Sequence, residues 1–262
     1  VEIHDVQAFV FDYDGTLVPI AAMPEEAVMN DEVKEILTQL LGLSDCHLVI
    51  VSGRALPDLK KVVNTEGVLF VGNHGFEIEG TFTQKLTPIP YQQDLEVIRE
   101  KLQNKFSAIP GVWLEDKGII LTVHYRLVQG RRIPLVRMIF AAICQDYVTQ
   151  DRINIMEGKK VLEIRPPIKW DKGEAAKLLL LKEQQALGTD RVLPVYIGDD
   201  FTDEYAFRAL KNVGITIKVG KEKHSSANYY LKGQEEVTEL LKEFVRFKRE
   251  NEGGVDTGKT TV

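Results

Sequence analysis

Four short apolar runs, each ending directly in polar residues, constrain the fold more than any other feature of the sequence. They are AFVF before Asp12, HLVIV before Ser52, VLFV before Gly72 and VLPVYI before Gly198. Apolar and polar residues do not alternate in them, as they would in a strand with one face in water. The runs therefore predict strands that are buried on both faces, as in a parallel sheet covered by helices.

Helical patterns lie between these runs. Residues 31–42 (DEVKEILTQLLG) begin with an acid and end in glycine, and residues 173–187 (GEAAKLLLLKEQQAL) are rich in strong helix formers. Alternating strands and helices join parallel strands through helical crossovers. The sequence therefore predicts an α/β fold with a doubly wound, Rossmann-like parallel sheet as its core.

The middle of the chain has a different pattern. A helical stripe over 92–106 precedes GVWLED and IILTVHYR, which Lys117-Gly118 separates. A second helix is expected over 131–149, before INIM and KKVLEIR, which Glu157-Gly158 separates. Tight turns between paired strands favour antiparallel pairing, so we predict an inserted α+β cap domain of order αββαββ. The expected limits are 1–87 and 167–250 for the halves of the core, 88–166 for the cap and 251–262 for a disordered tail.

The expected tail contains a chance match to a nucleotide-binding motif. Gly253 to Thr260 fit the phosphate-loop pattern G-x-x-x-x-G-K-[ST]. That loop binds phosphate only between a buried strand and the N-terminus of a helix. Here a charged helical segment comes before the match, so we expect no nucleotide site.

Composition argues against several classes of function. The 33 basic and 39 acidic residues give a net charge of −6, which disfavours nucleic acid as a partner. No apolar run reaches the roughly 18 residues of a membrane helix, and VEIHD lacks the features of a signal peptide. Cys46 and Cys144 have no metal-ligand spacing. Buried, reduced thiols in a cytoplasmic protein are expected.

The polar residues after the predicted strands carry the chemistry. Ligands of α/β sheets bind beyond the carboxyl ends of the strands, where Asp12, Asp14, SGR (52–54) and GDDFTDE (198–204) are expected to meet. Several carboxylates in one place repel one another unless a cation joins them. Hard oxygen ligands favour Mg²⁺, so we predict a magnesium site here.

The two acids of DYDGT suit different steps of phosphoryl transfer. Asp12, at the strand end, can attack phosphorus and form an aspartyl-phosphate. Asp14 points the same way in an extended chain, and it can protonate the leaving oxygen and later accept a proton from water. Thr16, Ser52 and Lys172 would supply hydroxyl groups and positive charge to the phosphoryl group.

These elements together resemble the four motifs of the haloacid dehalogenase-like phosphohydrolases. DYDGT resembles the first motif, Ser52 the second, Lys172 the third and GDDFTD the fourth. The resemblance implies that Asp12 is the nucleophile, Asp14 the general acid/base, and the insert a C2-type cap. It also implies a set of magnesium ligands: the Asp12 carboxylate, the Asp14 main-chain carbonyl and Asp199, with Asp200 and Asp203 as outer-shell or secondary ligands.

Within that superfamily, the segments DYDGTLVPI, VSGR, GNHG, EDKGIILTVHYR, GKKVLEIRP and GDDFTDEYAF resemble the trehalose-6-phosphate phosphatases. Glu115 and Lys117 fit the E-x-K of that family, and Lys159 and Glu163 fit its K-x-x-x-E. The resemblance implies that these residues bind hydroxyls of the sugar remote from the phosphate. Arg126 would join them or pair with an acid within the cap. The roles of Asn73 and His74 are left open.

Several alternatives stay open at this point. A related phosphatase would act on sucrose phosphate or on a glycosyl-phosphoglycerate, and a phosphomutase would reuse the same motifs. A rival from another class is a non-catalytic domain that binds sugar phosphate for regulation. Association or fusion with a trehalose-phosphate synthase fits either reading. For the charged cap residues, the simpler reading is solvated charge at the rim of a sheet.

Overall fold

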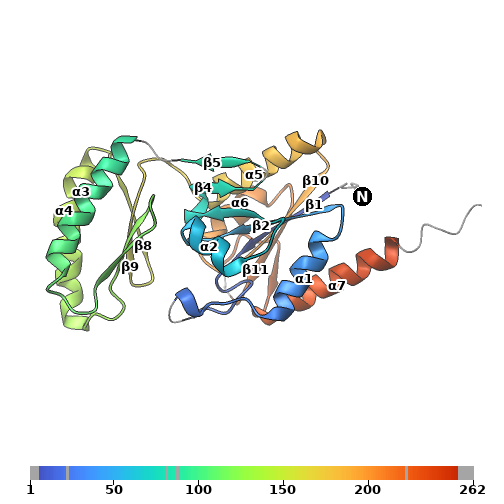
Figure 1. The fold of residues 1–262 in the computed structure, drawn as a ribbon, viewed down its shortest axis with the longest axis horizontal. Coiled ribbons are helices and arrows are strands. Elements are labelled where there is room, and N and C mark those ends of the chain that lie inside the picture. The colour runs from blue at the N-terminus through green and yellow to red at the C-terminus, as the bar shows by residue number, and fades with distance from the viewer. Residues whose placement is uncertain (1–5, 22–23, 81, 87–88, 222–223, 253–262) are drawn as a thin grey trace, which may run out of the picture. The chain divides into compact units, whose positions relative to one another are not determined.

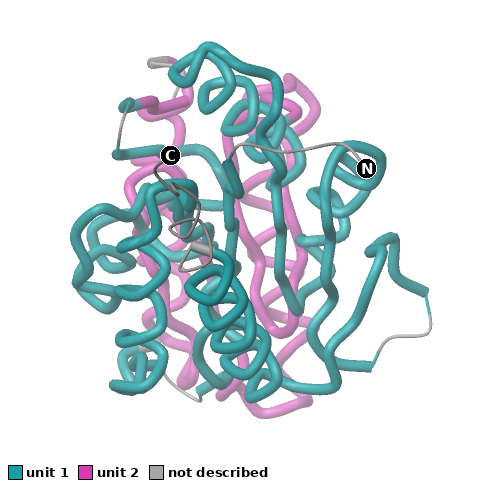
Figure 2. The backbone as a smooth tube through the Cα atoms, turned by 90° about the vertical axis from the view of Figure 1, so that its right-hand side faces the viewer, with its two compact units in different colours: residues 1–83, 170–262 teal, residues 84–169 magenta. Residues whose placement is uncertain are grey.

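The structure is a computed structural model that describes residues 6–21, 24–80, 82–86, 89–221 and 224–252. The chain forms two compact units, which Figure 2 shows in different colours. We call residues 1–83 with 170–262 the core unit and residues 84–169 the insert unit. The limits that we predicted for the insert, 88–166, differ by a few residues from those of this unit and remain a prediction.

The core unit contains a mixed sheet with helices on both faces (Figure 1). Within the described residues its sheet has eight strands in the order β12-β11-β10-β1-β2-β3-β4-β5, of which β5 begins at Thr83, the last residue of the first half of the core unit, and continues into the insert unit. The strands are β1 (Val6–Asp12), β2 (Cys46–Val51), β3 (Leu69–Gly72), β4 (Glu77–Glu79), β5 (Thr83–Lys85), β10 (Val192–Gly198), β11 (Ile215–Val219) and β12 (Tyr229–Leu231). The helices are α1 (Asp31–Leu41), α2 (Leu56–Val63), α5 (Lys172–Leu187), α6 (Asp203–Leu210) and α7 (Glu235–Glu252).

The central strands are buried on both faces, as their apolar runs predict. Phe9 and Phe11 of β1 pack on one face with apolar residues of α1, α2 and α7. Val10, on the other face, belongs to a cluster with residues of α5 and α6. Strands β10, β1, β2 and β3 pair in parallel. The predicted α/β class with a parallel-sheet core is confirmed.

The sheet also contains elements that the sequence patterns did not reveal. Strand β4 pairs antiparallel with β3, and β11 and β12 extend the other edge in parallel. Helix α1 begins at Asp31, as predicted, and the residue before it, Asn30, caps the helix, since its side chain accepts a hydrogen bond from the Val33 amide. Helix α7 includes Asn251 and Glu252, which we expected in the tail. Residues 253–262, with the phosphate-loop match, lie outside the described residues.

The insert unit has the predicted order αββαββ. Its elements are α3 (Ile89–Phe106), β6 (Trp113–Asp116), β7 (Leu121–His124), α4 (Ile133–Thr149), β8 (Asn154–Gly158) and β9 (Val161–Arg165). In the described part of the unit these strands form one antiparallel sheet in the order β6-β7-β9-β8. Leu121, Val123, Leu162 and Ile164 pack in one apolar cluster with residues of both helices, which cover this face.

One turn of the insert unit differs from the prediction. We expected Glu157-Gly158 to separate its last two strands, but β8 continues through Gly158. The reversal falls on Lys159 and Lys160, and Lys160 has a φ of 68°. Lys159 therefore lies in a turn rather than in a strand, since Gly158 still pairs with Val161.

The predictions for the two cysteines and for membrane-spanning helices can also be compared with the structure. Cys46 and Cys144 are both buried and neither takes part in a disulfide. Burial raises the pKa of the Cys144 thiol to about 12, which keeps this thiol protonated. A search of the described helices for one that could cross a membrane finds none.

Two phenylalanines of the core unit test the packing of the α6 face. Phe207 is fully buried beside the Tyr196 ring, whereas Phe247 of α7 is 63% exposed. Phe207→Ala should cost about 3–5 kcal/mol of unfolding free energy, because it leaves a cavity. Phe247→Ala should cost roughly 0.5 kcal/mol or less. Urea unfolding of the two variants measures both values, and equal losses would contradict this packing.

Candidate active site

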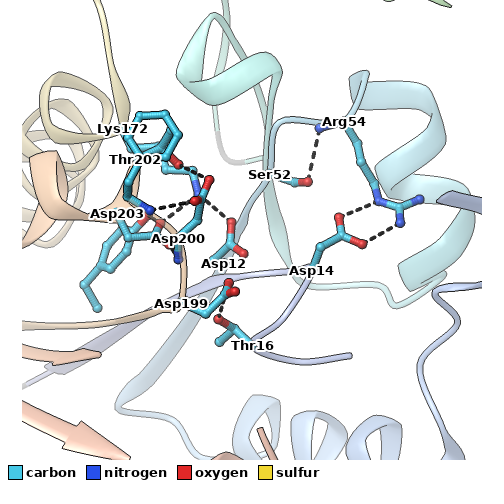
Figure 3. A network of polar contacts seen from close by, with 12 residues as sticks. Asp12, Asp14, Thr16, Ser52, Arg54, Lys172, Asp199, Asp200, Thr202 and Asp203 are labelled. Carbon is cyan, nitrogen blue, oxygen red and sulfur yellow. Dashed lines mark hydrogen bonds and ion pairs between the residues drawn. The ribbon is translucent and has the colours of Figure 1, made fainter. Parts of the chain in front are cut away.

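Parallel pairing brings the polar ends of β1, β2 and β10 to one edge of the core sheet. Asp12 lies beside Val51 in the pairing of β1 with β2, and Phe11 lies beside Ile197 in the pairing with β10. Ser52 and Asp199, which follow β2 and β10, therefore lie close to Asp12, as Figure 3 shows. The order of connections reverses at β1, which is where α/β sheets bind ligands.

Three carboxylates form an acidic cluster at this edge. One oxygen from each of Asp12, Asp199 and Asp203 lies within 4.8 Å of the others. Asp12 is 5% exposed and Asp203 is fully buried. Among the described residues, this is the group of acids whose spacing suits a metal ion. Hard carboxylate oxygens at such a spacing fit Mg²⁺.

A buried lysine holds two of these acids together. The Nζ of Lys172 donates to Oδ1 of Asp12 at 2.5 Å and to Oδ1 of Asp203 at 2.7 Å. The same Asp203 oxygen accepts a hydrogen bond of 2.9 Å from the Tyr196 hydroxyl. Lys172 begins α5, and the preceding Asp171 caps that helix by accepting hydrogen bonds from two backbone amides. The ammonium group of Lys172 therefore lies at the N-terminus of a helix, as the sequence predicts.

Burial and mutual repulsion shift the pKa values of the acids. Burial raises the pKa of Asp12 well above its ordinary value, and Asp203 and Asp199 add to this, against the opposing effect of Lys172. Burial, with Asp203, raises the pKa of Asp199 to about 6. Burial disfavours the charge of Lys172, yet Asp12 and Asp203 outweigh it and raise the pKa of this lysine. The site therefore has an excess of buried negative charge that a divalent cation would neutralise.

The turn after Asp12 needs glycine for steric reasons. Gly15 has a φ of +89°, and a Cβ on it would lie 2.2 Å from Oδ2 of Asp199. Thr16 follows, fully buried, and its hydroxyl donates to Oδ1 of Asp199 at 3.5 Å. The DGT sequence thus allows the β1 and β10 loops to approach each other closely.

Asp14 makes a different contact from Asp12. Its carboxylate accepts two hydrogen bonds from Arg54, of 2.8 Å from Nε and 2.6 Å from the guanidinium end. Figure 3 shows the Asp14 side chain turned toward Arg54 rather than toward Lys172. The guanidinium also lies 5.2 Å from the centre of the Tyr13 ring. Arg54 was not among the predicted site residues, although the SGR segment that contains it was.

Two further predicted residues lie on the loops around the cluster. Ser52 is buried, and its hydroxyl accepts a hydrogen bond of 3.1 Å from the Arg54 amide. Asp200 is exposed, and its carboxylate accepts a hydrogen bond of 2.6 Å from the Phe201 amide. Its side chain thus contacts its own loop, and Asp203 is the acid that joins Asp12 and Asp199. The sequence analysis missed Lys218, whose buried Nζ donates to the Asp199 carbonyl at 2.6 Å.

The two residues whose roles were left open lie next to the SGR segment. Asn73 and His74 have φ values of 50° and 57°, a left-handed conformation that is uncommon for residues other than glycine. The His74 amide donates to the Ser52 carbonyl and the Asn73 amide to the Arg54 carbonyl. Their backbone therefore supports the loop that carries Ser52 and Arg54.

In the insert unit, the predicted sugar-binding residues form two groups. The Nζ of Lys117 lies 3.8 Å from Glu115 and 3.7 Å from Glu163, so these three residues lie together. Arg126 is exposed and donates to the Lys159 carbonyl at 3.2 Å, at the turn before β9. The sequence analysis missed Arg165, which donates to Glu163 at 2.5 Å, and His124, which bonds to Glu115 at 2.7 Å.

The acidic cluster predicts that Mg²⁺ stabilises the protein in a pH-dependent way. With the pKa of Asp199 raised to about 6 in the fold, its contribution to stability is present below about pH 4 and is lost as the pH rises through 6. Mg²⁺ needs the ionised acids, so saturating Mg²⁺ should raise Tm more at about pH 7.5 than at about pH 5. Thermal unfolding with and without Mg²⁺ measures this. Asp199→Asn should remove most of the increase, and an equal increase at both pH values would contradict the prediction.

Comparison with known proteins places this geometry in a family. The profile of the trehalose-phosphatase family matches residues 10–235. Trehalose-phosphate phosphatase B of Arabidopsis thaliana is 35% identical over 256 residues, which cover 92% of this chain and 67% of that protein.

Two solved structures share the fold. The C-terminal domain of trehalose-6-phosphate phosphatase from C. albicans is 25% identical, with a TM-score of 0.78 over 93% of each chain. A haloacid dehalogenase-like hydrolase from Bacteroides thetaiotaomicron is 16% identical, with a TM-score of 0.65 over 91% of this chain and 99% of that one, and shows likeness of fold alone. The chain therefore belongs to the trehalose-phosphatase family.

Proposed function

We propose that this phosphatase hydrolyses trehalose 6-phosphate to trehalose and inorganic phosphate, with Mg²⁺ and through an aspartyl-phosphate on Asp12. The observation that carries the proposal is the buried Asp12 carboxylate, which bonds to Lys172 at the end of β1 and lies beside Asp199 and Asp203. A nucleophile, a fixed cation and a set of metal ligands are thus within a few ångströms of one another. The match to trehalose-phosphate phosphatases supports the choice of substrate.

The nucleophilic step uses Asp12. An oxygen of its carboxylate attacks phosphorus, the new oxygen–phosphorus bond forms, and the bond to the sugar oxygen breaks. Lys172 holds this carboxylate in place through Oδ1. Its charge also offsets the negative charge that develops on the phosphoryl oxygens. The hydroxyl groups of Ser52 and Thr16 are the proposed donors to those oxygens.

Asp12, Asp199 and Asp203 would hold Mg²⁺, and the Asp14 carbonyl and Asp200 stay predicted ligands. When bound, the ion supplies positive charge that neutralises the acids and the phosphate. This fits the residues present, because an uncompensated cluster of three buried or half-buried carboxylates is unfavourable.

Asp14 is the proposed general acid and base. It would give a proton to the departing sugar oxygen, and it would then accept one from the water that hydrolyses the aspartyl-phosphate. Its two hydrogen bonds from Arg54 hold the carboxylate in a defined orientation.

We propose that Glu115, Lys117, Arg126, Lys159 and Glu163 of the insert bind sugar hydroxyls. Carboxylates accept hydrogen bonds from hydroxyls, and ammonium and guanidinium groups donate to them. Glu115, Lys117 and Glu163 are mostly buried and lie close together, unlike freely solvated surface charges. A cytoplasmic location and association with a trehalose-phosphate synthase stay predictions.

A release assay over a panel of phosphate esters tests the proposal. Trehalose 6-phosphate should be the best substrate, ahead of sucrose 6-phosphate, a glucosyl-phosphoglycerate and glucose 6-phosphate, and EDTA should abolish the activity. Asp12→Asn is the control, since an amide is not an anionic nucleophile, and it should leave about 1% of the rate or less. If the enzyme preferred another ester, the assignment of trehalose 6-phosphate as the substrate would be wrong. Binding of trehalose 6-phosphate without release would favour the regulatory alternative.

The role of Asp14 predicts a dependence on the leaving group. Asp14→Asn removes the transferable proton and should lower the rate on trehalose 6-phosphate by about 10²–10⁴-fold. The loss should be much smaller on an aryl phosphate, whose leaving group needs no proton. Rates for both esters measure the difference, and equal losses would mean that Asp14 is structural or only a metal ligand.

The proposed sugar-binding residues predict selective losses. Glu163→Ala and Lys117→Ala should each lower kcat/KM on trehalose 6-phosphate by roughly 10- to 150-fold, because each removes a hydrogen bond to a charged group. An aryl phosphate should be nearly unaffected. Glu157→Ala is the matched control, since Glu157 lies on β8 of the same sheet but is about half exposed and pairs with Arg137. If kcat/KM fell equally on both esters, these residues would stabilise the fold rather than bind the sugar.

A further inference from the structure

One face of the insert sheet is not covered by α3 and α4. Side chains alternate between the faces of a sheet, and the buried row of Leu121 and Val123 faces the helices. Pairing places Trp113 opposite His124, and Glu115 opposite Thr122. Thr122 in turn pairs with Glu163, so aromatic and charged side chains share the other face.

Trp113 and His124 form a stacked aromatic pair on that face. Their ring centres are 3.7 Å apart and their planes differ by 1°. Trp113 remains 38% exposed although the imidazole covers one face of its indole. Its exposed surface therefore lies on the other face and on the ring edges. An exposed tryptophan supported by a flat ring is a rigid apolar platform.

His124 also contacts one of the proposed sugar-binding residues. Its Nε2 lies 2.7 Å from Oε2 of Glu115, and the Nζ of Lys117 lies 3.8 Å from the same oxygen. Burial raises the pKa of Glu115, but the bond from His124 and the charge of Lys117 outweigh burial and lower it. Glu115 is therefore an ionised acceptor whose orientation depends on His124.

We infer that Trp113 and His124 are specificity-determining residues of this phosphatase. Trp113 packs against the C–H face of a sugar ring, and His124 is a positioning residue that orients Glu115 toward a hydroxyl of the same ring. The inference rests on the proposed sugar-binding role of the insert and adds an apolar contact to it. A sugar ring has C–H groups on its faces and hydroxyls around its edge, which matches an aromatic plane flanked by Glu115 and Lys117.

Kinetics on two esters test the aromatic contact. Trp113→Ala should lower kcat/KM on trehalose 6-phosphate by about tenfold, with a smaller loss for Trp113→Phe, and neither should affect an aryl phosphate by more than about twofold. Leu135→Ala is the control, because Leu135 is 41% exposed on α4, away from the sheet. Losses equal on the two esters, or no loss on trehalose 6-phosphate, would overturn the role of Trp113.

A double-mutant cycle tests the positioning role. His124→Phe keeps a flat ring against Trp113 but removes the N–H that Glu115 accepts. If His124 acts through Glu115, His124→Phe should lower kcat/KM on trehalose 6-phosphate in the wild type. It should have little further effect in a Glu115→Ala background. Additive losses would overturn the positioning role.

Fluorescence gives a test that does not depend on catalysis. The chain has two tryptophans, so Trp170→Phe leaves Trp113 as the sole emitter. Titration with trehalose, which lacks phosphate, should change its emission saturably, and Glu163→Ala should weaken the response. Absence of a saturable change would overturn the contact. If the wild type releases no phosphate from trehalose 6-phosphate but Trp113 still responds to trehalose, the proposed function fails and this contact stands.

Discussion

The buried ammonium group of Lys172 is the interaction on which the core unit most depends. It bonds to Asp12 at the end of β1 and to Asp203 at the start of α6, with all three side chains almost fully buried. Removing one partner of such a group leaves an uncompensated charge, which typically costs 3–5 kcal/mol. These residues come from opposite sides of the insert in the sequence, so this contact joins the two halves of the core at the point where the chemistry occurs.

Two kinds of electrostatic environment follow from the fold. In the acidic cluster of the core unit, three carboxylates surround one lysine, and burial raises the pKa values of Asp12 and Asp199. In the insert unit, acids and bases alternate, since Lys117 lies between Glu115 and Glu163 and Arg165 supports Glu163. The first arrangement suits a cation and a phosphoryl group, and the second suits neutral hydroxyls.

The neighbouring acids Asp12 and Asp14 differ through their partners. Asp12 bonds to the ammonium group of Lys172, which also bonds to Asp203, whereas Asp14 accepts two hydrogen bonds from the guanidinium of Arg54. The first contact restrains a nucleophile within a dense cluster. The second orients a carboxylate near the edge of the site, where its side chain is 36% exposed. Protons can therefore reach Asp14 more easily than Asp12, which agrees with acid–base catalysis by Asp14.

The sequence by itself determined the buried strands, the order αββαββ of the insert and the edge at which Asp12, Ser52 and Asp199 meet. Those features follow from local apolar patterns and from the common direction of parallel strands. Only the tertiary structure decided that Asp203 rather than Asp200 lies within the cluster. Both acids occur in GDDFTDE, but the start of α6 turns Asp203 inward, while the Asp200 carboxylate bonds to its own loop. The pairs Asp14–Arg54, Glu115–His124 and Glu163–Arg165 were likewise not evident beforehand. Each depends on loop geometry, strand register or rotamer choice, which apolar periodicity does not specify.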